Sequence, residues 1–188
     1  MTNRPSPPVS WSRIARRIRV PLGFVFAALY VYLARPTPLS MLLGVCIILP
    51  GLALRAASSG HVRKNETLAT SGPYAHTRNP LYLGSILIAI GFAVAARNWW
   101  IGIVIVVFFL AIYLPVIRDE ERFLTERFPE FVEYMRGVPR LIPCLTPFSK
   151  QNAAFSWDLY RKHREYNAAL GALAIMAVLV GKLLWTHR

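Results

Sequence analysis

The sequence predicts an all-α protein, a polytopic membrane helix bundle with about five transmembrane helices. Of its 188 residues, 55% are hydrophobic and 16% are charged, whereas soluble domains average roughly 45–50% and ~25%. The apolar residues gather in long runs, and the basic residues gather in every second connection between those runs. These observations exclude an ordinary soluble domain and an intrinsically disordered chain.

Five apolar runs are candidate membrane spans. A helix needs roughly 20 residues to cross a ~30 Å hydrocarbon core. The second, fourth and fifth runs reach that length, whereas the first and third need flanking residues. The runs are, in chain order, Val20–Ala34, Leu39–Ala57, Leu81–Ala96, Trp99–Ile117 and Ala168–Trp185.

Short features within and between these runs predict how the helices meet. Residues 35–38 and 97–98 are connections so short that they predict helical hairpins. Pro50 and Pro115 lie inside spans, where proline removes a backbone hydrogen bond and bends the helix. Small residues recur every four positions in the third run and predict close packing by another helix. They are Ser85, Ala89 and Ala93.

The basic residues predict which side each loop faces. Residues 1–19, 55–80 and 118–166 contain 18 of the 22 lysines and arginines, and all nine acidic residues. The positive-inside rule therefore places the N-terminus and both long loops in the cytoplasm. This topology accounts for the net charge of +13 better than nucleic-acid binding does. The chain is accordingly expected to be an integral membrane protein with no nucleic-acid partner.

The same reading divides the chain into three parts. Residues 1–19 are expected to form a basic amphipathic arm, which either anchors the first span, the favoured interpretation, or lies on an anionic lipid surface. Residues 20–150 form a membrane-embedded core with four spans. Residues 151–188 form a juxtamembrane segment and a fifth span.

Two cytoplasmic segments can build a site, because the outer connections are too short. The first is the loop from Arg55 to Pro80, whose motif is read from Glu66 to Gly84, and its irregular stretch ends at Asn79–Pro80, where a helix begins. Pro80 suits the first helical position, and Arg78 lies beside a helix N-terminus that favours a carboxylate or phosphate. The alternative is a capped re-entry into the membrane with a positive-inside arginine.

The second segment begins with three acids directly after the fourth span, Asp119, Glu120 and Glu121. Adjacent carboxylates at a membrane boundary are costly unless they are solvated or paired. They can supply a counter-charge for a cationic ligand, or they can form an interfacial salt-bridge cluster with Arg118 and Arg122. An amphipathic pattern follows the acids.

Metal and nucleotide motifs are absent from the sequence. The four histidines share no ligand spacing, and the two cysteines lie too far apart in the predicted topology to pair. We therefore expect no metal site. These residues are His61, His76, His163, His187, Cys46 and Cys144.

Together the two segments resemble the superfamily of isoprenylcysteine carboxyl methyltransferases and phospholipid methyltransferases. The first is similar to the pattern G-x-Y-x-x-x-R-H-P-x-Y-x-G, matched by Gly72, Tyr74, Arg78, Pro80, Tyr82 and Gly84. The second is similar to E-E-x-x-L-x-x-x-F followed by Y-x-x-x-V-P-x-x-x-P, matched by Glu120, Glu121, Leu124, Phe128, Tyr134, Val138, Pro139 and Pro143. Asn79 replaces the usual histidine. The resemblance covers residues 39–143 and leaves the fifth span unexplained.

The resemblance implies S-adenosylmethionine as cofactor, bound where the helices meet the cytoplasmic loops. It implies catalytic roles for Arg118, which matches an arginine implicated in substrate handling, and for Glu121. Either Glu120 or Glu121 would hold the amino group of the cofactor. The implied cofactor-binding residues are Glu66, Thr67, Leu68, Ala69, Tyr74, Arg78, Asn79, Pro80, Leu81, Tyr82, Glu120 and Glu121.

The expected function is methyl transfer to a lipid-like or prenylated acceptor, most like isoprenylcysteine carboxyl O-methylation. His76 is the only base near the motifs, which favours an acid or thiol acceptor over an amine. Alternatives are a phospholipid N-methyltransferase of the phosphatidylethanolamine type, an NADPH-dependent membrane reductase of the sterol reductase type, and a non-enzymatic membrane scaffold. Asn79 supports the reductase, whereas Pro80 and the paired glutamates oppose it.

Overall fold

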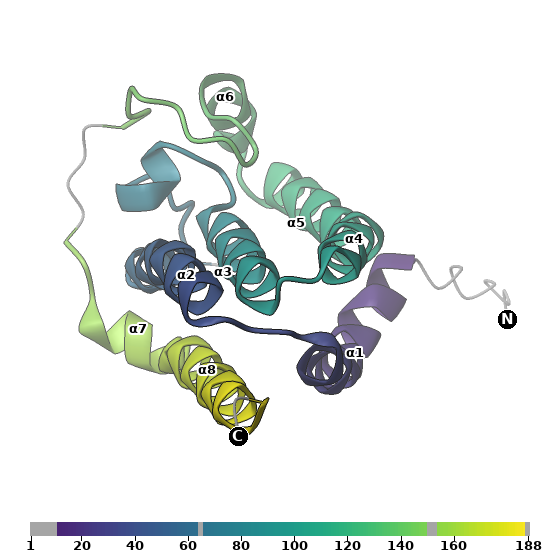
Figure 1. The fold of residues 1–188 in the computed structure, drawn as a ribbon. Coiled ribbons are helices and arrows are strands. Elements are labelled where there is room, and N and C mark those ends of the chain that lie inside the picture. The colour runs from purple at the N-terminus through teal and green to yellow at the C-terminus, as the bar shows by residue number, and fades with distance from the viewer. Residues whose placement is uncertain (1–10, 64–65, 150–153, 187–188) are drawn as a thin grey trace, which may run out of the picture.

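The computed structural model describes residues 11–63, 66–149 and 154–186, and within them every regular element is a helix (Figure 1). This confirms the all-α prediction for the described part of the chain. The elements are α1 (Trp11–Leu33), α2 (Pro38–Ser59), the 3-10 turn η1 (Gly72–Ala75), α3 (Pro80–Ala96), α4 (Trp99–Phe108), the π-helical turn η2 (Phe109–Tyr113), α5 (Leu114–Arg127), α6 (Phe131–Gly137), α7 (Trp157–Lys162) and α8 (Tyr166–Thr186).

Three of these helical segments are long and apolar enough to cross a membrane. They are Pro38–Ser59, Trp99–Arg127 and Tyr166–Thr186, and they correspond to the three predicted runs of full length. Pro21–Leu33 and Pro80–Ala96 are shorter apolar helices. The membrane character is therefore confirmed, and a count of five spans stays a prediction.

The fourth predicted run is one continuous rod built from α4, η2 and α5. The rod contains a wide turn directly before Pro115, where Leu114 donates its backbone N–H to the carbonyl of Phe109 five residues earlier. The rod continues to Arg127, past the predicted end of the span at Ile117. That extension carries the acidic residues out of the apolar bundle on a rigid helix. Pro50, in contrast, lies within a single continuous helix, α2.

The tightest packing in the bundle joins α2 to α3, and it depends on two pairs of glycines. A Cβ atom on Gly44 would lie 2.6 Å from the carbonyl oxygen of Gly91, and one on Gly51 would lie 2.8 Å from that of Gly84. The two glycines of each helix are seven residues apart, so they lie on the same face of that helix. The close approach predicted for the third run therefore exists, but glycines make it. Ala89, one of the residues predicted to make it, faces a cavity.

Helix α8 packs against α1 and α2. Leu179 is fully buried in a cluster that includes Ala34 at the end of α1 and Ala95 at the end of α3. Lys182 donates from Nζ to the carbonyl oxygens of Val31 (2.7 Å) and Tyr32 (2.9 Å). The lysine therefore caps the C-terminal end of α1, where carbonyl groups have no partner within the helix.

Helix α1 makes its main contacts with α5, η2 and α8, so the hairpin predicted between α1 and α2 is not a packed pair. Residues 1–10 of the predicted arm lie outside the described residues. From Trp11 onward the arm is helical and continuous with the first apolar run.

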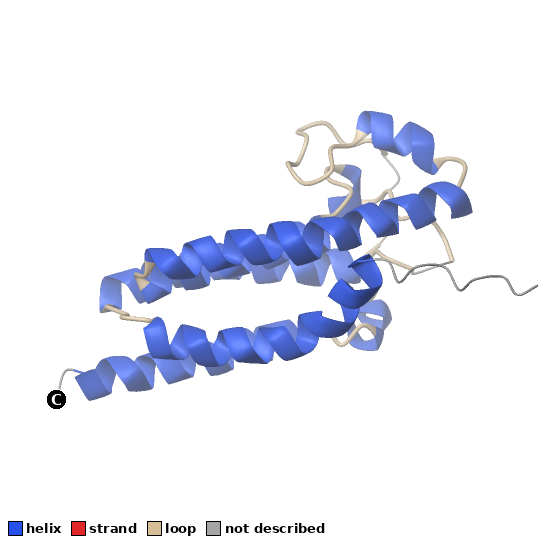
Figure 2. Cartoon of the chain, turned by 90° about the vertical axis from the view of Figure 1, so that its right-hand side faces the viewer, coloured by secondary structure: helices blue, strands red, loops and turns tan. Residues whose placement is uncertain are grey.

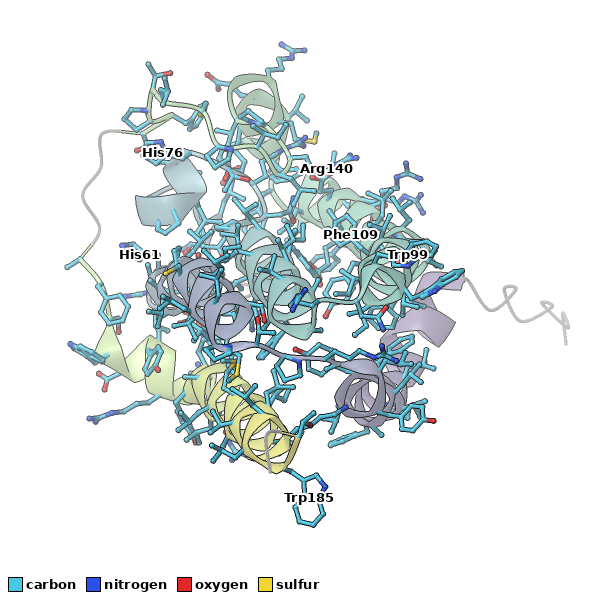
Figure 3. The ribbon with its side chains drawn as sticks, viewed as in Figure 1. His61, His76, Trp99, Phe109, Arg140 and Trp185 are labelled. Carbon is cyan, nitrogen blue, oxygen red and sulfur yellow. The ribbon has the colours of Figure 1, made fainter. Side chains whose placement is uncertain are left out.

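The connections divide between the two ends of the bundle (Figure 2). The long loops, η1 and α6 gather at one end, whereas the two short connections lie at the other end, where α8 finishes. Trp185 projects from that end of α8 and is exposed (Figure 3). This separation matches the two-sided pattern of charges in the sequence, although the orientation in a membrane stays a prediction.

The glycine contact between α2 and α3 predicts a position-specific effect of one methyl group. Gly51→Ala should lower the stability of the folded protein by about 1–3 kcal/mol, because its Cβ has no room beside backbone atoms of α3. Gly102→Ala in α4 is the matched control, because nothing lies within 4 Å of its Cβ. Thermal unfolding in detergent would measure both, and equal melting temperatures would contradict the packing.

Candidate active site

A polar cavity of about 1000 Å³ lies at the end of the bundle where the long loops gather. Both predicted segments contribute to its walls, together with the end of α2, the loop that follows it, α6 and the corner before α8. Its charged lining residues are Arg55, Arg63, Arg78, Asp119, Glu120, Glu121, Arg122, Glu126 and Glu165.

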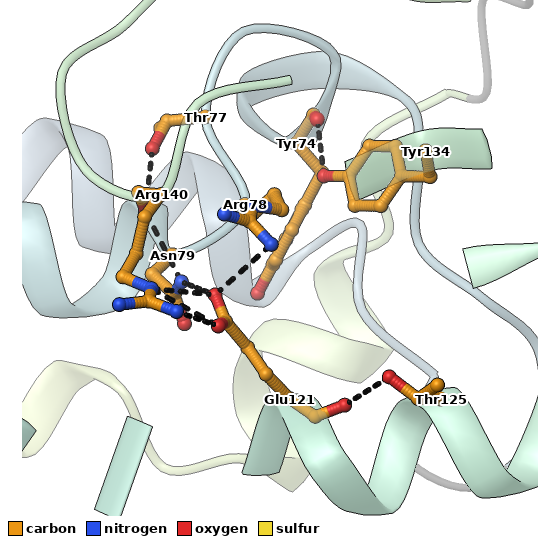
Figure 4. Close-up of polar contacts among 8 residues, drawn as sticks. All are labelled: Tyr74, Thr77, Arg78, Asn79, Glu121, Thr125, Tyr134 and Arg140. Carbon is orange, nitrogen blue, oxygen red and sulfur yellow. Dashed lines mark hydrogen bonds and ion pairs between the residues drawn. The ribbon is translucent and has the colours of Figure 1, made fainter. Parts of the chain in front are cut away.

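The carboxylate of Glu121 is the centre of a buried polar network beside this cavity (Figure 4). Arg140 donates to it from Nη2 at 2.6 Å and from Nε at 3.0 Å. Asn79 donates from Nδ2 at 3.2 Å, and Nη1 of Arg78 lies 3.4 Å away. The carboxylate is 8% exposed. Two guanidinium groups and one amide therefore replace the water that a buried carboxylate loses.

Arg78 belongs to both the network and the cavity. One of its terminal nitrogens pairs with Glu121, but its Nε is buried and has no hydrogen-bond partner among the described residues. A buried N–H without an acceptor is costly, and native proteins rarely leave one unpaired. Arg78 also lines the cavity and its side chain is 12% exposed, so an anionic group of a ligand can contact this arginine.

The irregular segment that follows α6 runs beside the first motif and holds it in place. The backbone N–H of Arg78 donates to the carbonyl of Pro139 at 2.9 Å, and the Thr77 hydroxyl donates to the carbonyl of Arg140 at 3.2 Å. The Tyr134 hydroxyl donates to the carbonyl of Tyr74 at 2.6 Å. Burial raises the pKa of both tyrosines well above the usual value, so both phenols stay protonated.

Most of the predicted site residues come together at the cavity. Ten of them line it, namely Thr67, Leu68, Ala69, Tyr74, Arg78, Asn79, Leu81, Tyr82, Glu120 and Glu121. Three do not. Glu66 and Arg118 are exposed outside the lining, and Pro80 is buried at the first position of α3. The roles assigned to all thirteen residues stay predictions.

Sequence reasoning missed several residues that the fold brings to this cavity. Nε of Arg55 pairs with Glu165 at 2.5 Å, across 110 positions of sequence. His163 also lines the cavity, and its Nδ1 lies 3.1 Å from the carbonyl oxygen of Ser59. His76 does not line it, and its Nδ1 contacts the carbonyl of Cys144 at 2.8 Å. No spacing rule links the end of α2 to the start of α8.

A second chamber, of about 390 Å³, lies between α1, α3, α4 and η2 and is almost entirely apolar. Ser85 and Tyr113 line both this chamber and the polar cavity. Tyr82 packs edge-on against Tyr113, with ring centroids 5.6 Å apart. The two spaces therefore adjoin each other at Ser85 of α3 and Tyr113 of η2, and this shared wall is called the junction below.

Comparison with known proteins identifies the segment that carries the motifs. Residues 58–130 match the family described as phospholipid methyltransferase. The chain is 36% identical over 107 residues to the cobalt-zinc-cadmium resistance protein CzcN of Cupriavidus metallidurans, which covers 57% of this chain and 48% of that protein. It is 32% identical over 90 residues to the nickel-cobalt-cadmium resistance protein NccN of Alcaligenes xylosoxydans xylosoxydans, covering 48% of this chain and 42% of that protein.

The chain thus spans about half the length of the curated relatives it matches. No solved structure matches it. The matched segment contains the first motif, α3, the rod and the paired glutamates. Residues 58–130 therefore match the phospholipid methyltransferase family, which is part of the superfamily of isoprenylcysteine and phospholipid methyltransferases that the two motifs predict.

Proposed function

We propose that this protein is an integral membrane methyltransferase that transfers a methyl group from S-adenosylmethionine to a lipid-like acceptor. The observation that carries the proposal is the junction at Ser85 and Tyr113, where a polar cavity meets an apolar chamber. A water-soluble cofactor and an apolar tail can each occupy the space that suits it. The family of residues 58–130 supports methyl transfer as the reaction.

The proposed membrane arrangement has five spans, with the N-terminus and the polar cavity on the cytoplasmic side. Pro21–Leu33 and Pro80–Ala96 serve as the two shorter spans. The gathering of the long, basic loops at one end of the bundle supports this orientation.

The cavity offers complementary groups for the methionine part of the cofactor. Glu120 lines the cavity, is exposed, and has no ion pair or hydrogen bond of its side chain to a described residue. Glu121 is already neutralised by Arg78 and Arg140. Glu120 is therefore the better partner for the ammonium group, and Arg78, which lines the cavity, suits the carboxylate. Asn79 acts by orienting Glu121.

When bound, S-adenosylmethionine would supply an electrophilic methyl group on a sulfonium, with S-adenosylhomocysteine as the leaving group of its in-line transfer to the acceptor. The chain's own residues then have to align the acceptor and exclude water. Tyr82 and Tyr113 stand at the junction where the acceptor head would meet the cavity. A carboxylate acceptor needs no base, and His76 is engaged elsewhere. These features support O-methylation of a carboxylate at the end of a prenyl or acyl chain.

A second candidate is N-methylation of a lipid amine, and His163 is the observation that favours it. If the Nδ1 of His163 donates to the carbonyl of Ser59, Nε2 is left as a proton acceptor on a residue that lines the cavity. An amine must lose a proton before or during methyl transfer, and Nε2 can receive it. Methylation of a phosphatidylethanolamine but not of a prenylcysteine would establish this second function.

The division of roles between the paired glutamates is testable by calorimetric binding of S-adenosylhomocysteine. Glu120→Gln should weaken binding at least about tenfold while the melting temperature stays unchanged, because it removes one charge-assisted contact. Glu121→Gln should instead lower the free energy of unfolding by about 2–4 kcal/mol. This range is below that of a fully buried pair, because solvent screens Arg140, whose side chain is 39% exposed. Glu133→Gln, at an exposed position of α6, is the matched control.

Unchanged affinity in Glu120→Gln would contradict the assignment of the ammonium site. A parallel titration with NADPH tests the reductase, and binding of NADPH without S-adenosylhomocysteine would replace the methyltransferase with it. Binding of neither compound by folded protein would leave only the scaffold.

The apolar chamber predicts a substitution that harms acceptor use alone. Ala89 lines the chamber, so Ala89→Phe should fill part of it and reduce methyl transfer to N-acetyl-S-farnesylcysteine severalfold or more. Binding of S-adenosylhomocysteine should not change, because Ala89 does not line the polar cavity. Ala53→Phe, on the exposed face of α2, controls for the added ring. Equal transfer rates in the two variants would show that the chamber does not hold the acceptor.

A further inference from the structure

Arg55 stands where the two cavities meet. It lines the polar cavity, and its Nη1 donates to the Ser85 hydroxyl at 2.5 Å and to the carbonyl of Leu81 at 3.3 Å. Ser85 in turn lines the apolar chamber. The guanidinium of Arg55 is therefore held against α3, one hydrogen bond away from a residue that lines the chamber.

The donor groups of Arg55 are not all used. An arginine side chain has five N–H groups. Nε donates to Glu165, and Nη1 has two acceptors. Nη2 carries the remaining two N–H groups and makes no hydrogen bond within the described part of the chain. Nη2 is not a buried atom without a partner, because the Arg55 side chain is 24% exposed. Two donors thus remain accessible on a guanidinium whose orientation is already fixed.

Leu81 and Ser85, which accept from Nη1, lie inside the family match, whereas the ion pair that fixes Nε lies outside it. Arg55 precedes residues 58–130 and Glu165 follows them. Glu165 lies at the corner between α7 and α8, next to Arg164, whose φ of 52° is left-handed and unfavourable for a residue with a side chain. The carboxyl group of Glu165 is 10% exposed. The corner thus combines an unfavourable backbone conformation with a largely buried carboxylate, and it places that carboxylate on Arg55.

We propose that Arg55 binds the anionic head group, a carboxylate or a phosphate, of a single-chain amphiphile whose tail lies in the apolar chamber. A guanidinium presents paired N–H groups that match either anion. The chamber volume of about 390 Å³ lies near the low end of ligand pockets and suits one hydrocarbon chain. A cationic head group is disfavoured, because the carboxylate of Glu165 already pairs with Arg55. The assignment rests on the proposed function for its acceptor role, but binding itself needs no cofactor.

Ligands with one tail and different head groups test the assignment. Oleate, oleyl phosphate, oleyl alcohol and oleylamine would be compared for displacement of a fluorescent fatty acid from the full chain in lipid nanodiscs. One or both anions should displace the probe at concentrations at least about tenfold lower than the alcohol or the amine. The better of the two anions identifies carboxylate or phosphate as the head group. Equal or stronger displacement by oleyl alcohol or oleylamine would overturn the proposal.

Two variants separate ligand binding from a purely structural role of Arg55. Arg55→Gln should lose at least about tenfold in affinity for the preferred anion and little for oleyl alcohol. Glu165→Gln removes the ion pair but keeps the guanidinium, so its affinity for the anion should be equal or higher. A structural pair would instead make both variants lose affinity for the anion and the alcohol alike. Arg136→Gln, at an exposed position of α6, controls for the loss of one positive charge.

A titration with S-adenosylhomocysteine on the same samples keeps this proposal distinct from the proposed function. Selective anion binding that depends on Arg55, in protein that does not bind S-adenosylhomocysteine, would support the anion site and reject the methyltransferase. Binding of S-adenosylhomocysteine with no preference for anions would reject the anion site alone.

Discussion

The buried carboxylate of Glu121 is the contact on which the arrangement of the candidate site depends. It joins α5 to Asn79 before α3 and to Arg140 in the irregular segment after α6. These segments contain few regular hydrogen bonds of their own, so a shared charge holds them at one distance from each other. A buried carboxylate without partners would be strongly destabilising. Arrangements that do not bring Asn79 and Arg140 to Glu121 are therefore disfavoured. The loops can close over α5 only in the register that supplies all its partners.

The same contact explains why adjacent glutamates have different surroundings. Consecutive residues on an α-helix point about 100° apart. When Glu121 points into the network with Arg78 and Arg140, Glu120 is turned to a more exposed side of α5 that still borders the cavity. Two identical side chains, one neutralised and one unpaired within the described residues, thus provide a structural anchor and an available negative charge. A pair of glutamates in the sequence gives no indication of which is which.

Sequence reasoning succeeded where the physics is local or periodic. The lengths of the apolar runs predicted which helices reach full membrane length, and the turn at Asn79–Pro80 predicted the start of α3. It did less well where contacts are distant. The small residues of α3 predicted a close approach to another helix, but the choice between glycine and alanine faces depends on how α2 crosses α3. The pair of Arg55 and Glu165 joins two helices with no common sequence pattern.

The C-terminal helix affects the site without contributing to either motif. Helix α1 forms one wall of the apolar chamber and makes no extensive contact with α2. Its C-terminal end is held by Lys182 and by the cluster around Leu179, both on α8. Next to the opposite end of α8, Glu165 pairs with Arg55 beside the junction. Helix α8 therefore positions a wall of the chamber at one end and an ion pair beside the junction at the other. If the chamber holds the acceptor, residues outside the family segment contribute to its selectivity through the α1 wall and through Arg55 and Glu165, so a shared family does not imply a shared acceptor.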